Sequence, residues 1–115
     1  MGKRIIAQRR GRGTQTYRSP SHRFIGAVSN RTYDTLEKEG VIAGRILDII
    51  NCPGHSAPLI EVEFEGGERI LTVAPLGLNT KNIIYSGKKA EVELGNTVPL
   101  SATAIGTQIH NIESQ

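Results

Sequence analysis

The chain has 115 residues, a formal charge of +3 and a single cysteine. Its length allows one modest domain, and one cysteine excludes both an intramolecular disulfide and a multi-cysteine zinc site. No apolar run approaches the roughly 18 residues of a membrane span, so we expect a soluble, intracellular protein with no membrane partner; a basic, acid-poor leader can also be read as an organelle transit peptide. No bound metal or other cofactor is expected.

The positive charge is concentrated at the start of the chain. Residues 1–31 contain eight of the fourteen Lys and Arg residues and no Asp or Glu. The first 31 residues therefore carry +8 and the remainder −5. A segment of this kind favours a polyanionic partner.

Residues 1–34 show no helical or strand periodicity, so they offer little apolar surface to offset the entropy of ordering them. We expect a basic, largely extended arm that becomes ordered on RNA. Guanidinium groups bind phosphate through two hydrogen bonds, and aromatic rings stack on unpaired bases. A solvated tail or an import signal has a similar composition, but the absence of any acid over this length favours RNA. The expected RNA contacts of the arm are Arg4, Arg9, Arg10, Arg12, Tyr17, Arg18, His22, Arg23 and Arg31.

Residues 35–95 are expected to form an RNA-binding β domain. After a short polar turn at Thr35–Gly40, the β-branched run Val41–Ile50 predicts a curved strand, with a bulge or bend at Gly44. The segment Leu59–Phe64 alternates apolar and acidic residues, as expected of a half-buried strand. Its buried face would hold Ile60, Val62 and Phe64.

Gly66-Gly67 predicts a two-residue type I′ hairpin turn, after which Arg69–Ala74 returns as the partner strand with Glu–Arg pairs across the hairpin. Two further strands are expected at Ile83–Tyr85 and Ala90–Leu94. Five short strands indicate an all-β fold, a small barrel of the oligonucleotide-binding (OB) type.

A second basic cluster is expected to support the contact with RNA. It consists of Lys81, Lys88 and Lys89, the last two in the loop before the final barrel strand. Adjacent lysines also occur simply as solvated surface residues, so this cluster supports the arm rather than standing alone.

No catalytic residue is predicted. Cys52 and His55 are three residues apart in a loop and could form a nucleophilic pair, but no carboxylate lies at a convincing spacing to orient the histidine. The paired glutamates of the strands fit solvent-facing positions, and no phosphate-binding loop or metal-ligand cluster is present. We therefore expect a protein that is not an enzyme.

Residues 96–115 are expected to be a linker and the start of a truncated second domain. The segment Thr107–Ile112 predicts a strand that has no partner in the sequence. This pattern leaves open whether the chain is a piece of a longer protein or one half of a naturally split protein.

Several motifs, in order along the chain, closely resemble the archaeal form of the large-subunit ribosomal protein L-two family. They are Gln8-Arg9-Arg10-Gly11-Arg12-Gly13, Tyr17-Arg18-Ser19-Pro20-Ser21-His22-Arg23, Val41-Ile42-Ala43-Gly44, Ser56-Ala57-Pro58, Glu63-Phe64, Ala74-Pro75, Gly95-Asn96-Thr97 with Pro99-Leu100, and His110-Asn111-Ile112-Glu113.

The resemblance implies a structural protein of the cytoplasmic ribosome, with its arm threaded into large-subunit ribosomal RNA and an OB-type barrel packed on that RNA. Neighbouring ribosomal proteins would be partners, and a second polypeptide could supply a C-terminal domain, which in the family is an SH3-like barrel. One loop departs from the family, because Cys52-Pro53-Gly54-His55 stands where relatives commonly have Asp-Pro followed by Arg. The alternative is a freestanding RNA-binding or RNA-chaperone module with a disordered basic arm.

Overall fold

The computed structural model describes residues 2–114 and shows a mostly β fold. The elements of this part of the chain are η1 (Ile6–Gly11), η2 (Ser21–Arg23), α1 (Thr35–Glu39), β1 (Ile42–Ile50), β2 (Leu59–Phe64), β3 (Arg69–Val73), β4 (Ile83–Ser86) and η3 (Leu100–Ala102), where η denotes a 3-10 helix. None of the helices between residues 2 and 114 has the length and apolar character needed to cross a bilayer.

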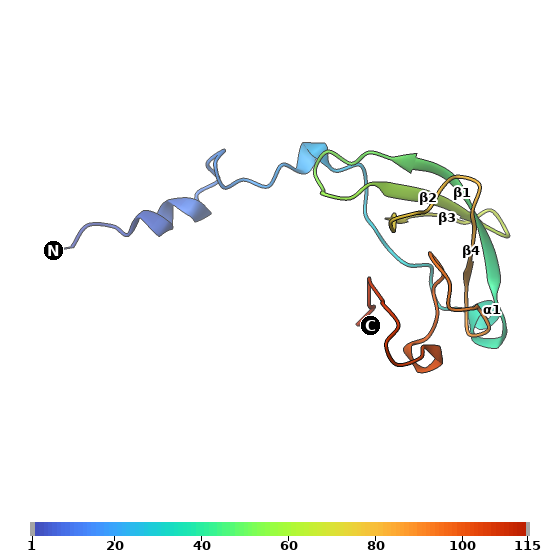
Figure 1. Cartoon of the computed structure of the whole chain (residues 1–115). Coiled ribbons are helices and arrows are strands. Elements are labelled where there is room, and N and C mark those ends of the chain that lie inside the picture. The colour runs from blue at the N-terminus through green and yellow to red at the C-terminus, as the bar shows by residue number, and fades with distance from the viewer. Residues whose placement is uncertain (1, 115) are drawn as a thin grey trace.

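The four strands form one antiparallel sheet in the order β3-β2-β1-β4, with the long strand β1 at its centre (Figure 1). The predicted curved first strand is confirmed, but its bulge lies between Ile46 and Asp48 rather than at Gly44. The reason for a glycine at position 44 is close packing. A Cβ there would lie 2.7 Å from Val62 Cγ1 and 2.9 Å from the Phe64 ring, distances that real side chains do not tolerate.

The core lies on one face of this sheet and follows the two-residue period of the strands. The predicted inward residues Ile60, Val62 and Phe64 are all buried, as are Ile42 and Ile46 on β1. Ile84 of β4 completes the buried cluster. Because this cluster is small, a single unfavourable buried group represents a large fraction of the stability of the fold.

The hairpin between β2 and β3 is present, with a turn one residue longer than expected. The amide of Phe64 donates to the Glu68 carbonyl over 2.8 Å, and the amide of Gly67 donates to the Phe64 carbonyl over 3.0 Å. These bonds enclose three residues, 65–67, instead of a two-residue type I′ turn. Both glycines have the predicted positive φ, 99° at Gly66 and 87° at Gly67. The predicted Glu–Arg pairs are confirmed, since Arg69 contacts both Glu61 and Glu63.

The expectation of five strands is corrected to four in the described part of the chain. Residues 90–94 run through turns instead of a strand, with the Ala90 amide donating to Gly87 and the Glu93 amide to Glu91. The outer edge of β4 is instead occupied by Thr97, whose amide donates to the Tyr85 carbonyl and which forms an isolated parallel bridge with Ser86.

The predicted strand at Thr107–Ile112 is also absent from the described structure. Asn111 has φ of 53°, a left-handed conformation that interrupts an extended backbone. This segment lies across from Val28–Asn30 and Thr72, with which it lines a shallow pocket.

The N-terminal segment extends away from the sheet, shown in blue in Figure 1. Every residue from 2 to 29 is exposed. The segment makes the molecule elongated, with principal extents of 66 × 30 × 26 Å. It is not extended throughout, because Ile6–Gly11 forms the 3-10 helix η1.

Candidate nucleic-acid interface

The arm presents a dense set of unneutralised cations. Between residues 2 and 30 there is no acidic residue, and within the described structure no arm cation before Arg31 forms a salt bridge. Because these side chains are exposed, their charges are available to an external anion.

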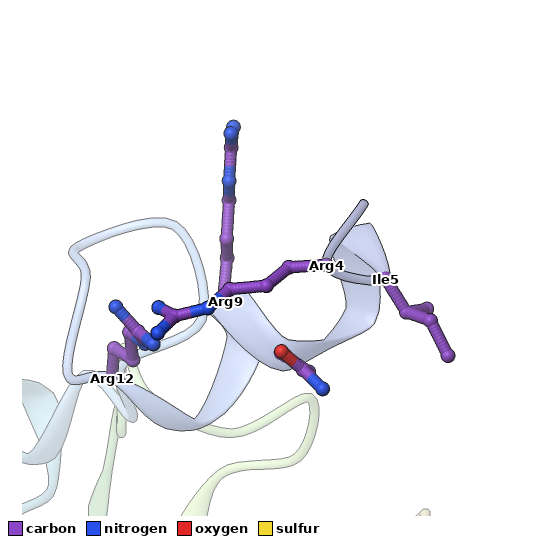
Figure 2. A pocket seen from close by; sticks show the side chains of 5 residues that line it. Arg4, Ile5, Arg9 and Arg12 are labelled. Atoms are coloured by element: carbon purple, nitrogen blue, oxygen red, sulfur yellow. The ribbon is translucent and has the colours of Figure 1, made fainter. Parts of the chain in front are cut away.

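The helix η1 gathers part of this charge around one pocket. A cavity of about 210 Å³ is lined by Arg4, Ile5, Gln8, Arg9 and Arg12. Figure 2 shows the Arg4 side chain running along the helix towards Arg12, whereas Arg9 points in a different direction. Residues three positions apart lie on the same side of a 3-10 helix, which accounts for Arg9 and Arg12, whereas Arg4 and Arg12 lie just outside Ile6–Gly11, at its two ends.

Arg10 takes a different position, over the ring of Tyr17 at 5.3 Å from the ring centroid. A guanidinium above one face of a tyrosine makes a cation–π contact. Tyr17 is 53% exposed, so much of its side chain is accessible to a stacking base.

The arm is attached to the sheet domain at a root formed by Arg23, Phe24 and the loop 52–55. The Phe24 and His55 rings stack with centroids 4.6 Å apart and an interplanar angle of 21°. The Cys52 thiol donates to the Arg23 carbonyl at 3.9 Å. Gly54 permits this contact, because a Cβ at that position would lie 2.3 Å from Phe24 Cδ1.

Cys52 and His55 are also in contact with each other, with Sγ and Nδ1 3.1 Å apart. This hydrogen bond, followed by one with the Ile25 backbone, lowers the pKa of the Cys52 thiol. Cys52 is nevertheless only 1% exposed, so no substrate can approach its sulfur in this conformation. Cys52 and His55 therefore belong to the root of the arm, where they contact Arg23 and Phe24.

Arg31 differs from the other expected RNA contacts because its charge is taken up within the fold. Its side chain is 8% exposed and lies beside the carboxylates of Asp34, Glu37 and Glu68. Its strongest contact is the hydrogen bond to Asp34, which raises the pKa of Arg31 above its ordinary value and lowers that of Asp34 to about 2. Nε lies 2.8 Å from Glu68 Oε2, but it has no hydrogen-bond partner of acceptable geometry, so this contact is a charge interaction alone. Arg31 therefore belongs to an internal network.

The buried member of this network is Glu37, which is 2% exposed. Its carboxylate lies 3.5 Å from Arg31 Nη1 and accepts a 2.6 Å hydrogen bond from the Ser86 hydroxyl. The network thus joins the end of the arm, α1 and β4.

The second basic cluster lies apart from the arm. The amides of Lys88 and Lys89 donate to carbonyls of Glu37 and Gly40 at 2.8 and 3.2 Å, and both side chains are exposed. The loop therefore packs beside α1, at the opposite end of the molecule from the N-terminus (Figure 1). Lys81 is exposed in the turn at Asn79–Asn82. The structure brings together Arg4, Arg9 and Arg12 around one pocket, and it leaves the lysines apart from them.

Two features of this surface were not expected from the sequence. Gln8 lines the η1 pocket. Its spacing of four residues from both Arg4 and Arg12 would have indicated this, had an α-helix been assumed for the segment. The stacking of Phe24 on His55 joins residues 31 positions apart and has no local sequence signal. Within residues 2–114 no group of three or more His, Cys, Asp or Glu side chains is placed to hold a metal ion.

Comparison with known proteins gives a consistent result. No family model matches the chain. The chain is 50% identical over all its 115 residues to the large ribosomal subunit protein uL2 of Methanothermobacter thermautotrophicus, of which it covers 48%. It is 53% identical over 114 residues to uL2 of Methanosphaera stadtmanae, covering 47%, and 47% identical to uL2 of Methanocaldococcus jannaschii, also covering 47%.

The chain thus spans about half the length of the curated relatives it matches. The resemblance to the archaeal L-two family, stated above from short motifs, is confirmed along the whole chain, which is similar from end to end to archaeal proteins named uL2 and matches about half the length of each.

Proposed function

We propose that the chain is a structural constituent of the large ribosomal subunit that binds large-subunit ribosomal RNA, and that it supports subunit assembly and translation in the cytoplasmic ribosome. The observation that carries the proposal is the acid-free arm, in which seven of the eight cations of residues 1–31, all but Arg31, are solvent-exposed, in a chain similar throughout to proteins named uL2. The partners proposed are ribosomal RNA and neighbouring ribosomal proteins.

The arm supplies most of the RNA contacts in this proposal. Its phosphate-binding residues are Arg4, Arg9, Arg10, Arg12, Arg18 and Arg23. Tyr17 and His22 stack on bases or form hydrogen bonds to them. Outside the arm, Lys81, Lys88 and Lys89 contact RNA beside the sheet. Arg31 holds the base of the arm in position, because its guanidinium is engaged by carboxylates.

The domain organisation is also part of the proposal: a basic arm at 1–34, an RNA-binding barrel at 35–95 and a linker with the start of a second domain at 96–115. The bulge of β1 between Ile46 and Asp48, together with its pairing with both β2 and β4, supports an OB-type arrangement, since a bulge bends a strand and helps a sheet curl into a partly open barrel.

The protein is proposed to act without catalysis of its own. The burial of Cys52 supports this, because its thiol, the only candidate nucleophile weighed above, is closed to substrate.

The proposal is tested by salt-dependent binding of the chain to large-subunit ribosomal RNA from Methanothermobacter thermautotrophicus. Neutralising six to ten phosphates should lower the affinity by roughly a thousandfold or more between 50 and 200 mM salt on a duplex, and somewhat less on single-stranded RNA. A nearly flat dependence would refute the proposal. Chemical footprinting should then show protection of defined helices.

The alternative, a freestanding RNA chaperone, predicts diffuse protection in the same footprint. The similarity to uL2 proteins favours the ribosomal proposal. Intact-mass spectrometry of purified large subunits tests the remaining partner, a second polypeptide: a stoichiometric 12.5 kDa species with a copurifying complement would support it, and a single longer species would exclude it.

A further inference from the structure

We propose that the η1 pocket is a binding site for a single RNA phosphate, gripped jointly by Arg4 and Arg12. The inference rests on the proposed function and deepens it, because it assigns two of the arm cations to one shared ligand. The remaining arm cations then bind other phosphates or hold bases.

The geometry supports a shared site. Arg4, Gln8, Arg9 and Arg12 line the same cavity of about 210 Å³, and Figure 2 shows Arg4 directed towards Arg12 and Arg9 pointing in a different direction. Arg10 is excluded from this site because it lies over the Tyr17 ring. The arginines in and beside η1 thus divide into those that line the pocket and Arg10, which lies over Tyr17.

The electrostatics favour an anion between the two guanidinium groups. Like charges that converge on one cavity repel each other, and no acidic residue lies within the first thirty residues to compensate. A phosphate removes this repulsion and accepts several guanidinium hydrogen bonds at once. Gln8 adds an amide donor without adding charge.

The shared site predicts that the two arginines are energetically coupled. With the ribosomal RNA probe named above, Arg4→Ala and Arg12→Ala should each weaken binding about tenfold. The double variant should bind only slightly more weakly than either single variant, because one substitution already disrupts the shared phosphate site. Arg4→Ala combined with Arg18→Ala is the matched control, since Arg18 lies outside the pocket, and its two effects should multiply to about a hundredfold.

The salt dependence counts the phosphates directly. Loss of one phosphate contact lowers the slope of log affinity against log salt by about 0.7–0.9. The Arg4/Arg12 double variant should therefore lose about 0.7–0.9 from the slope, as for one phosphate. A loss of about 1.4–1.8 together with multiplicative effects would mean two separate phosphates and would overturn the inference, while leaving the proposed function intact. A flat slope in the unmodified chain would refute the proposed function itself.

A charge-matched pair of variants gives a second test. Gln8→Glu places a carboxylate in the pocket, where it competes with phosphate for the guanidinium groups, whereas Gln15→Glu makes the same change on the arm outside the pocket. Binding should be weakened at least several-fold more by Gln8→Glu than by Gln15→Glu. Equal effects would show that only the total charge of the arm matters and would overturn the inference.

Discussion

Replacement of Arg31 by alanine should destabilise the folded chain strongly, because it leaves a buried carboxylate without its cation. Glu37 is 2% exposed, and after the substitution only the Ser86 hydroxyl would remain as its hydrogen-bond partner. Removing one member of a buried ion pair costs about 3–5 kcal/mol. The Asp34 and Glu68 side chains are 36% and 43% exposed, so water compensates most of their loss.

The expected loss is therefore about 3 kcal/mol, at the low end of the range for buried pairs because Ser86 still donates to Glu37. With an unfolding dependence of roughly 2 kcal/mol per molar urea, the midpoint should fall by about 1.5 M. Far-UV circular dichroism in urea measures this directly, and tyrosine fluorescence provides a second probe in a chain that has no tryptophan.

Two further variants make the interpretation specific. Arg18→Ala removes the same charge from the exposed arm and should leave the midpoint unchanged. Combining Arg31→Ala with Glu37→Gln removes both charges of the buried pair and should restore most of the stability. If Arg31→Ala unfolds at the same urea concentration as Arg18→Ala, the network does not stabilise the fold and the reasoning is wrong.

Three other outcomes follow from the structure. The lowered pKa of Asp34, about 2 in the folded chain against an ordinary value of 3.8, contributes stability that is present above pH 3.8 and lost as the pH falls towards 2; Asp34→Asn should remove that part of the acid sensitivity in pH-dependent thermal melts. Gly87→Ala should destabilise by more than about 1 kcal/mol, because φ is 143° and a Cβ would lie 2.4 Å from a backbone oxygen, whereas Gly11→Ala, which meets no atom within 4 Å, should be neutral in the same melts. The Cys52 thiol has a lowered pKa but is buried, so it should react with iodoacetamide only on unfolding. Rapid alkylation of the folded chain would contradict the buried geometry. Cys52→Ser should leave RNA affinity unchanged.

The strands with clear local patterns were predictable. The alternation in Leu59–Phe64 and the β-branched run Val41–Ile50 each match a strand of the sheet within a residue or so, because burial of one face imposes a period of two. The segment Ala90–Leu94 has the same short apolar character but forms turns. Nothing local distinguishes it, since the edge of β4 is occupied by Thr97 further along the chain.

The candidate interface shows the same limit. The excess of arginine in the arm indicated an anionic partner, and the short motifs indicated the similarity to proteins named uL2. The burial of Arg31 among carboxylates was not predictable as a whole. Asp34 and Glu37 are close to Arg31 in the sequence, but Glu68 comes from the distant β2–β3 hairpin, and no local pattern indicates that contact. Composition shows how many cations a segment has, but only the fold shows which of them are already neutralised.

The fixed root at Phe24 and His55 has a kinetic consequence for the proposed RNA binding. Once the sheet domain has docked, the arm is tethered at a defined point, so each of its arginines searches a small volume instead of the whole solution. Such a tether raises the effective concentration of a second binding element to the millimolar range for short flexible connections. Individually weak phosphate contacts along residues 2–22 would then be occupied together, and each would rebind faster than the whole chain could dissociate.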